Sequence, residues 1–385
     1  MRRSFDIAVV GAGVFGSWIA YLLRLAGATV ALIDAYGPAN SRASSGGESR
    51  IMRLGYGPDE IYTRSAQRSL HLWLQFFQQA GGAVTSLFRQ TGVLWLASES
   101  DDYCEATLST LKTAGATCER LTRDDLIKRY PQLEVESVHW GILEPDAGIL
   151  LARQAVQLVC AAAEARGVTY LQLAVTSPSP AKKLESLTTT SGEQIHASQF
   201  VFACGPWLPK LFPSLLAHRF YITRQEVFFF GVPAGDERFN AGALPAWIDF
   251  NEFVYGIPNV DNRGFKLAID AHGTEFDPDT GERVASTEGL AAVRTCLAKR
   301  LPAMKDAPVL ESRVCQYENT SNGDFLIDVH PEMSNVWFVG GGSGHGFKHG
   351  PAVGEYVVRM LSGEGAREPR FSLASKQRLQ HRKVY

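Results

Sequence analysis

The first 34 residues carry a glycine-rich loop between two apolar segments. Residues 5–10 are an apolar run typical of a buried parallel strand, and the sequence GAGVFG follows at once. Apolar side chains then recur at helical spacing as far as Gly27, and a second apolar run, TVALID, ends at Asp34. The order strand, glycine loop, helix, strand and acid predicts a Rossmann-like βαβ unit.

Each glycine of this loop has a physical reason in such a unit. Gly11 permits the tight turn, Gly13 lets the backbone approach a pyrophosphate, and Gly16 allows the helix to pack closely on the strand. The helix N-terminus offers free N–H groups to the phosphates. The loop residues that we expect at a bound dinucleotide are Gly11, Gly13, Val14, Phe15 and Gly16.

Asp34 lies about 20 residues beyond the loop, where a carboxylate accepts hydrogen bonds from a ribose 2′-hydroxyl. A carboxylate here disfavours a 2′-phosphate, so NADP is not the expected ligand. The alternative is a glycine turn that binds no ligand. The presence of strand, glycine loop, helix, second strand and acid in the expected order argues against that alternative.

Beyond residue 34, the pattern of apolar residues changes from α/β to β-rich and back to α/β. Helical patterns cover 59–80, 151–166 and 287–300, and 105–130 is helical with turns. The apolar segment 199–207 predicts a third strand of the nucleotide-binding sheet. Residues 219–275 hold several strand-like runs separated by turn signals, which favours an antiparallel sheet. An apolar strand at 336–339, a glycine cluster and a helix from about 351 return to the α/β pattern.

Charge and cysteine usage exclude several classes of function. A net charge of −2 gives no field that would attract nucleic acid or an anionic membrane. The six cysteines include no CxxC pair, and no set of residues has the spacing of a metal site, so we expect no metal. We found no membrane-spanning run, export signal after Arg2-Arg3 or peroxisomal address in the final RKVY, and therefore expect a cytoplasmic protein.

Several motifs together resemble the monomeric sarcosine oxidase and N-methyltryptophan oxidase family, within the D-amino-acid oxidase superfamily. They are the GxGxxG unit with its acid, GESRIMRLGYG, CGPW, GFKLAID, CQY followed by FLIDVHP, and GGSGHGFKHGPAVGE. The likeness covers essentially the whole chain. It implies an α/β fold in which a Rossmann-like FAD-binding domain (1–83, 144–217 and 320–385) is joined to a β-rich, antiparallel substrate domain (84–143 and 218–319).

The resemblance implies FAD as the cofactor, attached covalently through Cys315. A cysteine at this position of the family forms a thioether to the 8α-methyl group of the flavin, and a thiolate is a suitable nucleophile for that bond. The alternative from the residue alone is a buried, inert cysteine. The family likeness also places Ser45, Arg50, Gly342, Gly344, His345, Gly346, Phe347 and Lys348 at the cofactor.

The same likeness implies roles for charged residues over the flavin. Arg53 and Lys348 would bind the carboxylate of the substrate, since arginine offers a planar fork and lysine a point charge. Lys266 lies in an apolar strand, GFKLAID, where the family has a lysine that promotes reaction with O2. Surface charge is the commonest state of both residue types and is the alternative in each case.

Tyr255, Tyr317 and Asp270 complete the expected catalytic residues. The tyrosines match active-site positions of the family, although tyrosine is also a common filler of half-buried strands. Sarcosine oxidases have a histidine where this chain has Asp270, and a His-His-Gly run where it reads Ser45-Gly46-Gly47. The acid changes the charge of the pocket and puts sarcosine itself in doubt as the substrate.

We therefore expect FAD-dependent oxidation of the C–N bond of a secondary amine, an N-alkyl or cyclic amino acid, to an imine, with O2 reduced to hydrogen peroxide. The alternatives are a flavin dehydrogenase, an oxidase of a primary amino acid or an amino sugar adduct, and a non-enzymatic dinucleotide-binding protein. The expected partners are the small-molecule amine and O2, and the expected state is a monomer, with a dimer as the alternative.

Overall fold

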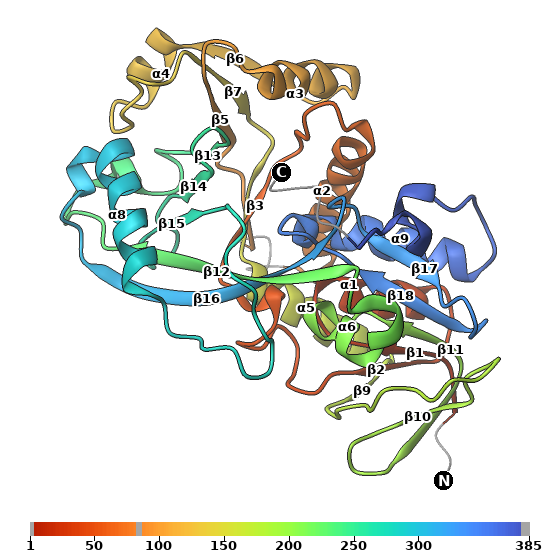
Figure 1. Ribbon diagram of the computed structural model, residues 1–385. Helices are drawn as coiled ribbons and strands as arrows, with labels where there is room; N and C mark the ends of the chain where they lie inside the picture. The colour runs from red at the N-terminus through yellow and green to blue at the C-terminus, as the bar shows by residue number, and fades with distance from the viewer. Residues whose placement is uncertain (1–3, 82–86, 379–385) are drawn as a thin grey trace.

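The computed structural model describes residues 4–81 and 87–378, and these residues form two lobes (Figure 1). The chain crosses between the lobes several times, so each is built from separated segments. The expectations on Arg2-Arg3 and on the last four residues lie outside the described part of the chain. No helix among the described residues has both the length and the apolar character needed to cross a bilayer.

A seven-stranded sheet organises the first lobe, which we call the nucleotide lobe. β1 lies at its centre, between β11 and β2, and pairs with both in parallel, as the apolar run after residue 4 predicts. The helices α1, α5 and α9 pack together beside this sheet (Figure 1). In spatial order the strands are β17 (Leu326–Val329), β18 (Val336–Gly340), β11 (Gln194–Phe202), β1 (Ser4–Val10), β2 (Val30–Ile33) and β9 (Thr169–Leu171), with β10 (Ser186–Thr188) paired to β11.

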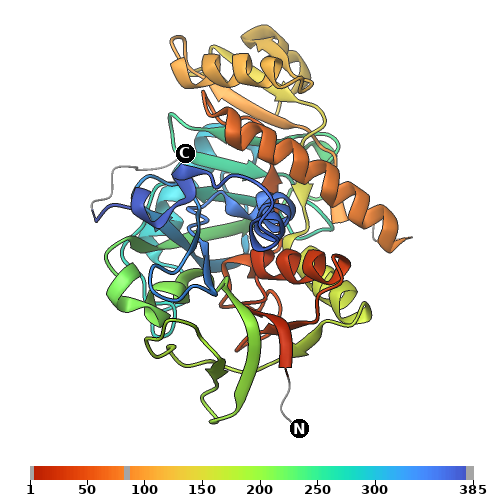
Figure 2. The same cartoon turned by 90° about the vertical axis from the view of Figure 1, so that its right-hand side faces the viewer.

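The helices of the nucleotide lobe differ in how much of their surface is buried. α5 (Ala152–Ala165) buries one apolar face, with the spacing of a helix that covers other elements on one side. α1 (Val14–Leu25) is buried on all sides from Val14 to Tyr21, because it packs against α5, α9, β1 and β2. α9 (Gly350–Leu361) packs against α1 and also against α2 (Glu60–Ala80). Figure 2 shows α2 as a long orange helix on the outer face, between the two lobes.

An eight-stranded sheet organises the second lobe. Its neighbouring strands are antiparallel except for the pair β13–β5, which is parallel. In order they are β16 (Val309–Thr320), β12 (Phe220–Phe230), β15 (Phe265–Ile269), β14 (Val254–Ile257), β13 (Ala246–Asp249), β5 (Val93–Ala97), β7 (Trp140–Glu144) and β6 (Glu119–Thr122). The helices α3 (Asp102–Thr113), α4 (Arg123–Arg129) and α8 (Thr287–Arg300) complete this lobe.

Two long strands and a small sheet connect the lobes. β12 and β16 pair over almost their whole length and extend from the second lobe to the nucleotide lobe (Figure 1). A three-stranded sheet of β3 (Arg50–Met52), β8 (Gly148–Leu150) and β4 (Phe88–Arg89) lies between the larger sheets. Consequently the second half of β16 and the start of β3 reach the junction of the lobes.

The predicted fold class, a Rossmann-like α/β domain with a β-rich second domain, is confirmed by this architecture. One local expectation was wrong: β6 interrupts the helical region 105–130, where Leu121 turns inward between exposed polar residues. The predicted domain limits stay a prediction, and the limit at 83/84 lies outside the described residues.

Candidate active site

A cleft of about 370 Å³ opens at the carboxyl ends of β1, β2 and β11. This edge of a doubly wound sheet is where ligands bind in open α/β folds. The residues expected at the cofactor that line the cleft are Gly11, Gly13, Val14, Phe15, Asp34, Ser45, Arg50, Cys315, Gly342, Gly344, Gly346 and Phe347. Three further residues expected there, Gly16, His345 and Lys348, are not part of the wall of this cleft.

The floor of the cleft needs glycine for steric reasons. Gly11 has φ of 105°, and a Cβ there would lie 2.2 Å from the carbonyl oxygen of Ala203. A Cβ on Gly16 would lie 1.8 Å from the carbonyl oxygen of Gly11. The two glycines therefore allow the tight turn and the close packing of helix on strand that the dinucleotide fingerprint requires.

Polar groups at the start of α1 are oriented toward a phosphate. Gly13 precedes the helix without a side-chain cap, and the N–H of Val14 donates to Oγ of the buried Ser45 at 3.0 Å. A hydroxyl beside unpaired helix N–H groups suits a pyrophosphate. Asp34 accepts backbone N–H groups from Ala12 at 2.8 Å, and from Tyr36 and Gly37. These bonds fix its carboxylate at the cleft, with lone pairs left for a ribose hydroxyl.

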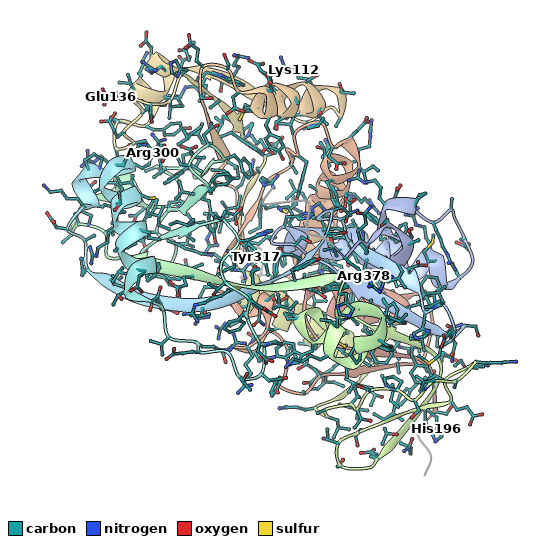
Figure 3. The ribbon with its side chains drawn as sticks, in the orientation of Figure 1. Lys112, Glu136, His196, Arg300, Tyr317 and Arg378 are labelled. Atoms are coloured by element: carbon teal, nitrogen blue, oxygen red, sulfur yellow. The ribbon has the colours of Figure 1, made fainter. Side chains whose placement is uncertain are left out.

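A second cavity of about 120 Å³ continues from the cleft toward the eight-stranded sheet. Both spaces are bordered by Arg50, Cys315, Tyr317, Gly344 and Phe347, so these residues form the passage between them. Figure 3 shows Tyr317 near the middle of the molecule, far from Lys112 in one lobe and His196 in the other. A group that enters the cleft can therefore extend into the junction of the lobes.

Two cations flank one aromatic ring in the second cavity. The guanidinium carbon of Arg53 lies 4.1 Å from the ring centroid of Tyr56, and Nζ of Lys348 lies 5.1 Å from it. Lys348 also donates to the Tyr56 hydroxyl at 2.7 Å, and Arg53 donates to the carbonyl oxygen of Gly55. Both cations are buried and line the cavity, which is an arrangement suited to binding a carboxylate.

A buried carboxylate supports the loop that carries Arg53. Glu144 accepts the N–H of Leu54 at 2.6 Å, the N–H of Gly55 and the indole N–H of Trp95. Burial raises the pKa of Glu144, while these hydrogen bonds and the charge of Arg53 oppose that shift. The sequence analysis missed Glu144, since an acid at the end of an apolar strand gives no sign of its partners.

Lys266 points into the second cavity and is almost completely buried. Its neighbours in β15, Phe265 and Leu267, face the core of the eight-stranded sheet, so the alternation of a strand puts Lys266 on the cavity side. Its ammonium group donates to the carbonyl oxygen of Ser49 at 3.1 Å and lies 5.6 Å from the ring centroid of Tyr255. Burial, assisted by the charge of Arg50, lowers the pKa of Lys266 to about 7.

Asp270, Tyr317 and Tyr255 lie on the wall formed by β14, β15 and β16. Tyr317 donates to Oδ1 of Asp270 at 2.6 Å, and burial followed by that carboxylate raises the pKa of Tyr317 well above its usual value. Tyr317 packs on Gly344, where a Cβ would lie 2.7 Å from the ring and φ is 79°. Gly344 thus lets the ring approach the backbone of the loop that follows β18.

The thiol of Cys315 lies at the passage between the two cavities. Its Sγ is 3.9 Å from Nη2 of Arg50, whose side chain also donates to the carbonyl oxygens of Ser44 and Ser49. Arg50 lies 5.8 Å from the ring centroid of Phe347. The sulfur is thus accessible from the cleft and has a cation beside it.

Three buried polar residues near the site were not singled out from the sequence. Glu318 lines the cleft, and its Oε1 has no hydrogen-bond partner among the described residues; burial raises the pKa of Glu318 to about 8. Tyr56 and His349 lie behind Lys348. His349 follows Lys348 directly in the sequence, and that adjacency was the only available signal. His345, which was singled out, lines the second cavity and lies 3.0 Å from the carbonyl oxygen of Gly323.

The donor set of the two cavities fits a flavin dinucleotide. The glycine floor and helix N-terminus suit the pyrophosphate, Asp34 suits the ribose, and the wider passage at Cys315 and Phe347 suits a flat ring. No cluster of three or more residues able to hold a metal ion occurs among the described side chains. The two cavities thus offer a cleft for a dinucleotide, with a small space beside it for a second molecule.

The fold and this cleft define a class of flavoprotein, and the family comparison agrees. Residues 6–360 match the family of FAD dependent oxidoreductases, and the chain belongs to that family. Within it the chain is similar to monomeric sarcosine oxidase of Bacillus sp. (strain B-0618), with 31% identity over 98% of this chain and 97% of the relative. The predicted resemblance to this group, and FAD as the cofactor, are thereby confirmed.

Two further relatives show how far the similarity extends. N-methyl-L-tryptophan oxidase of Yersinia pestis (strain Pestoides F) is 28% identical over 92% of this chain and 94% of its own length. The crystal structure of L-proline dehydrogenase from P. horikoshii has a TM-score of 0.84, with 21% identity over 97% of this chain and 98% of that one. The latter shows a shared fold.

Proposed function

We propose that this protein oxidises the C–N bond of a secondary amino acid, an N-alkyl or cyclic one, to an imine and passes the electrons to O2, giving hydrogen peroxide. The observation that carries the proposal is the continuity of the dinucleotide cleft with a small cavity that holds Arg53 and Lys348 on one side and Lys266 on another. FAD, when bound, supplies the two-electron redox chemistry. Relatives named for sarcosine and N-methyl-L-tryptophan support the substrate class.

Arg53 and Lys348 position the substrate by its carboxylate. Both cations are buried, and both lie against the Tyr56 ring, so a carboxylate bound there accepts charge-assisted hydrogen bonds in a site that is largely closed to water. Holding the carboxylate orients the rest of the molecule, and such orientation alone accounts for a large share of a barrier reduction. No side chain needs to act as a strong base if the amine is bound in its neutral form.

Lys266 is the group that we assign to the reaction with O2. A fixed positive charge in a cavity stabilises the negative charge that oxygen gains during electron transfer. Lys266 is buried, points into the cavity and is hydrogen-bonded to one backbone carbonyl, so its position is fixed before the reaction. This lysine favours the oxidase over the dehydrogenase alternative.

Cys315 is the residue that we assign to covalent attachment of the flavin. The residue lines both cavities at their junction, and its Sγ lies 3.9 Å from Nη2 of Arg50. Of the six cysteines, Cys204 also lines the cleft, but burial raises its pKa well above the usual value, which makes it a poor nucleophile.

The proposal is tested by a peroxide assay on the purified protein with a panel of amines. N-methyl and cyclic amino acids are expected to give peroxide, and the matching primary amino acids and fructosyl adducts much less. A parallel assay with a quinone dye under argon addresses the dehydrogenase alternative. Turnover with the dye but not with O2 would contradict the assigned role of Lys266.

A further inference from the structure

Four hydrogen-bonded side chains lead from the second cavity, where the substrate is proposed to bind, to the outer helix α2. They are Lys348, Tyr56, His349 and Ser65. Nζ of Lys348 donates to the Tyr56 hydroxyl at 2.7 Å, and that oxygen lies 2.7 Å from Nε2 of His349. On the far side of the imidazole, Nδ1 lies 2.9 Å from Oγ of Ser65. Lys348, Tyr56 and His349 are buried, whereas Ser65 is partly exposed on α2.

The imidazole of His349 has a hydroxyl on each nitrogen. Burial, together with the charges of Lys348 and Arg53, lowers the pKa of His349 well below its usual value, so one nitrogen donates and the other accepts. Because Lys348 donates to the Tyr56 oxygen, the Tyr56 proton is directed to His349 Nε2, and the proton on Nδ1 is directed to Ser65. The neutral ring can also hold its proton on Nε2, in which case Tyr56 donates to Nδ1 of His345 at 3.3 Å.

The proposed oxidation creates a need for such a chain. Amino acids reach the enzyme mainly as ammonium ions, and the nitrogen must lose a proton before electrons leave the C–N bond. We propose that Lys348, Tyr56, His349 and Ser65 form a proton path that carries this proton from the substrate cavity to solvent. The inference rests on the proposed function, because it takes the amine as the source of the proton.

The transfer balances without any further reactant. Lys348 gives a proton to Tyr56 as Tyr56 gives its own to His349 Nε2, and His349 releases the proton on Nδ1 through Ser65 to water. Neutral Lys348 then takes a proton from the substrate ammonium group, which restores the Lys348 ammonium and leaves a neutral amine. The net change is one proton moved from substrate to solvent and a shift of the His349 tautomer. After product release, Nε2 returns its proton through Tyr56 to water in the emptied cavity, and Nδ1 takes a proton from solvent through Ser65, which restores the tautomer.

Packing alone does not account for His349. The rings of Tyr62 and Phe325 lie 5.5 Å from it by their centroids, and a phenylalanine would fill the same space. The titratable or charged groups that face His349 from the elements around it are Lys348, Arg53, Tyr56, Tyr62 and His345. None of these groups is an acid, so no residue in the described part of the chain offers His349 an ion pair.

The test compares His349→Phe, His349→Gln and Tyr56→Phe with the parent holoenzyme. His349→Gln keeps a hydrogen-bonding amide beside Tyr56 but cannot exchange a proton between two nitrogens. Tyr62→Phe is the matched control, because its hydroxyl donates to Asp324 outside the path. The readouts are the anaerobic bleaching rate of the flavin across pH with an N-methyl amino acid, and proton release to an indicator dye.

Below the pKa of the substrate amine, we expect the flavin of the His349 and Tyr56 variants to bleach at least about 10-fold more slowly than that of the parent. Their proton release should be slowed by the same factor. Above that pKa the amine arrives neutral, so their rates should approach the parent rate. An equal loss at every pH, no loss, or the same loss in Tyr62→Phe would overturn the path. A parent that no amine bleaches would contradict the proposed function, and the path with it.

Discussion

Tyr317 donates a 2.6 Å hydrogen bond to the carboxylate of Asp270 on the wall of the second cavity. The same cavity is lined by the cations Arg53 and Lys348, whose charge is opposite to that of the carboxylate. The cavity is therefore polarised, with cations at one place and a carboxylate at another. A zwitterionic or cationic substrate fits such a space better than a simple anion does.

Asp270→Asn is expected to change substrate preference. Loss of the charge should lower kcat/KM about 10- to 100-fold for amino acids that carry a second cationic group, since a hydrogen bond to a charged group contributes about 1.5–3 kcal/mol. For substrates with neutral side chains we expect a change below about 3-fold. Tyr317→Phe is the matched control because it keeps the carboxylate. Equal losses for all substrates in a steady-state panel would rule out a role in specificity.

Arg53→Lys and Lys348→Met are expected to weaken carboxylate binding. Arg53→Lys keeps the charge but loses the two-pronged donor, and each variant should raise KM for amino acids about 10- to 100-fold. The same amines as methyl esters should be affected little. Arg64→Met, which removes an exposed arginine on α2, is the control for loss of a positive charge. Parallel losses with acid and ester would contradict carboxylate binding.

Lys266→Met is expected to slow reoxidation by O2 while sparing reduction by the substrate. The Lys266 ammonium group would stabilise the negative charge that oxygen gains, and removing such a group lowers the rate about 10²- to 10³-fold. With a pKa of about 7, Lys266 is protonated at low pH, so its contribution to reoxidation should decline as the pH rises through that value. Rapid mixing of the reduced protein with oxygenated buffer measures this step. Lys299→Met, an exposed lysine paired with Glu252, should leave it unchanged.

The same lysine makes stability depend on pH. Its pKa is about 7 in the folded protein and 10.5 ordinarily, so between these values the unfolded chain binds more protons than the folded one. Lys266 therefore lowers the free energy of unfolding most below pH 7, and this cost disappears as the pH rises toward 10.5. Lys266→Met should be more stable than the parent at pH 6, with the difference shrinking by pH 10 in urea titrations. A difference independent of pH would show that Lys266 is not desolvated.

Cys315→Ser is expected to release the flavin. After acid precipitation the parent pellet should stay yellow, whereas the variant should give a colourless pellet with flavin in the supernatant or absent. Cys204→Ser, at the other thiol of the cleft, should behave as the parent does. Colour in the supernatant from the parent itself would contradict covalent attachment.

Local patterns were enough to predict the scaffold. The order of strand, glycine loop and Asp34 predicted the central βαβ unit, because residues close together in the sequence determine that unit. The alternation of side chains along the strand correctly put Lys266 on the opposite face of the sheet from Phe265. Features that depend on contacts between distant segments were not predicted. Glu144 contacts Leu54, which lies 90 residues away in the sequence, and His349 contacts Tyr56, which lies 293 residues away. The local sequence around Glu144 or His349 therefore gives no sign of the partner.

The most direct test of the central claim is an anaerobic titration of the purified protein with N-methyl and cyclic amino acids, followed by its visible absorbance. The account predicts loss of the flavin absorbance with at least one of them, and full recovery on admitting air with one hydrogen peroxide formed per flavin. Absorbance that no such amine diminishes, or that air does not restore, would contradict it.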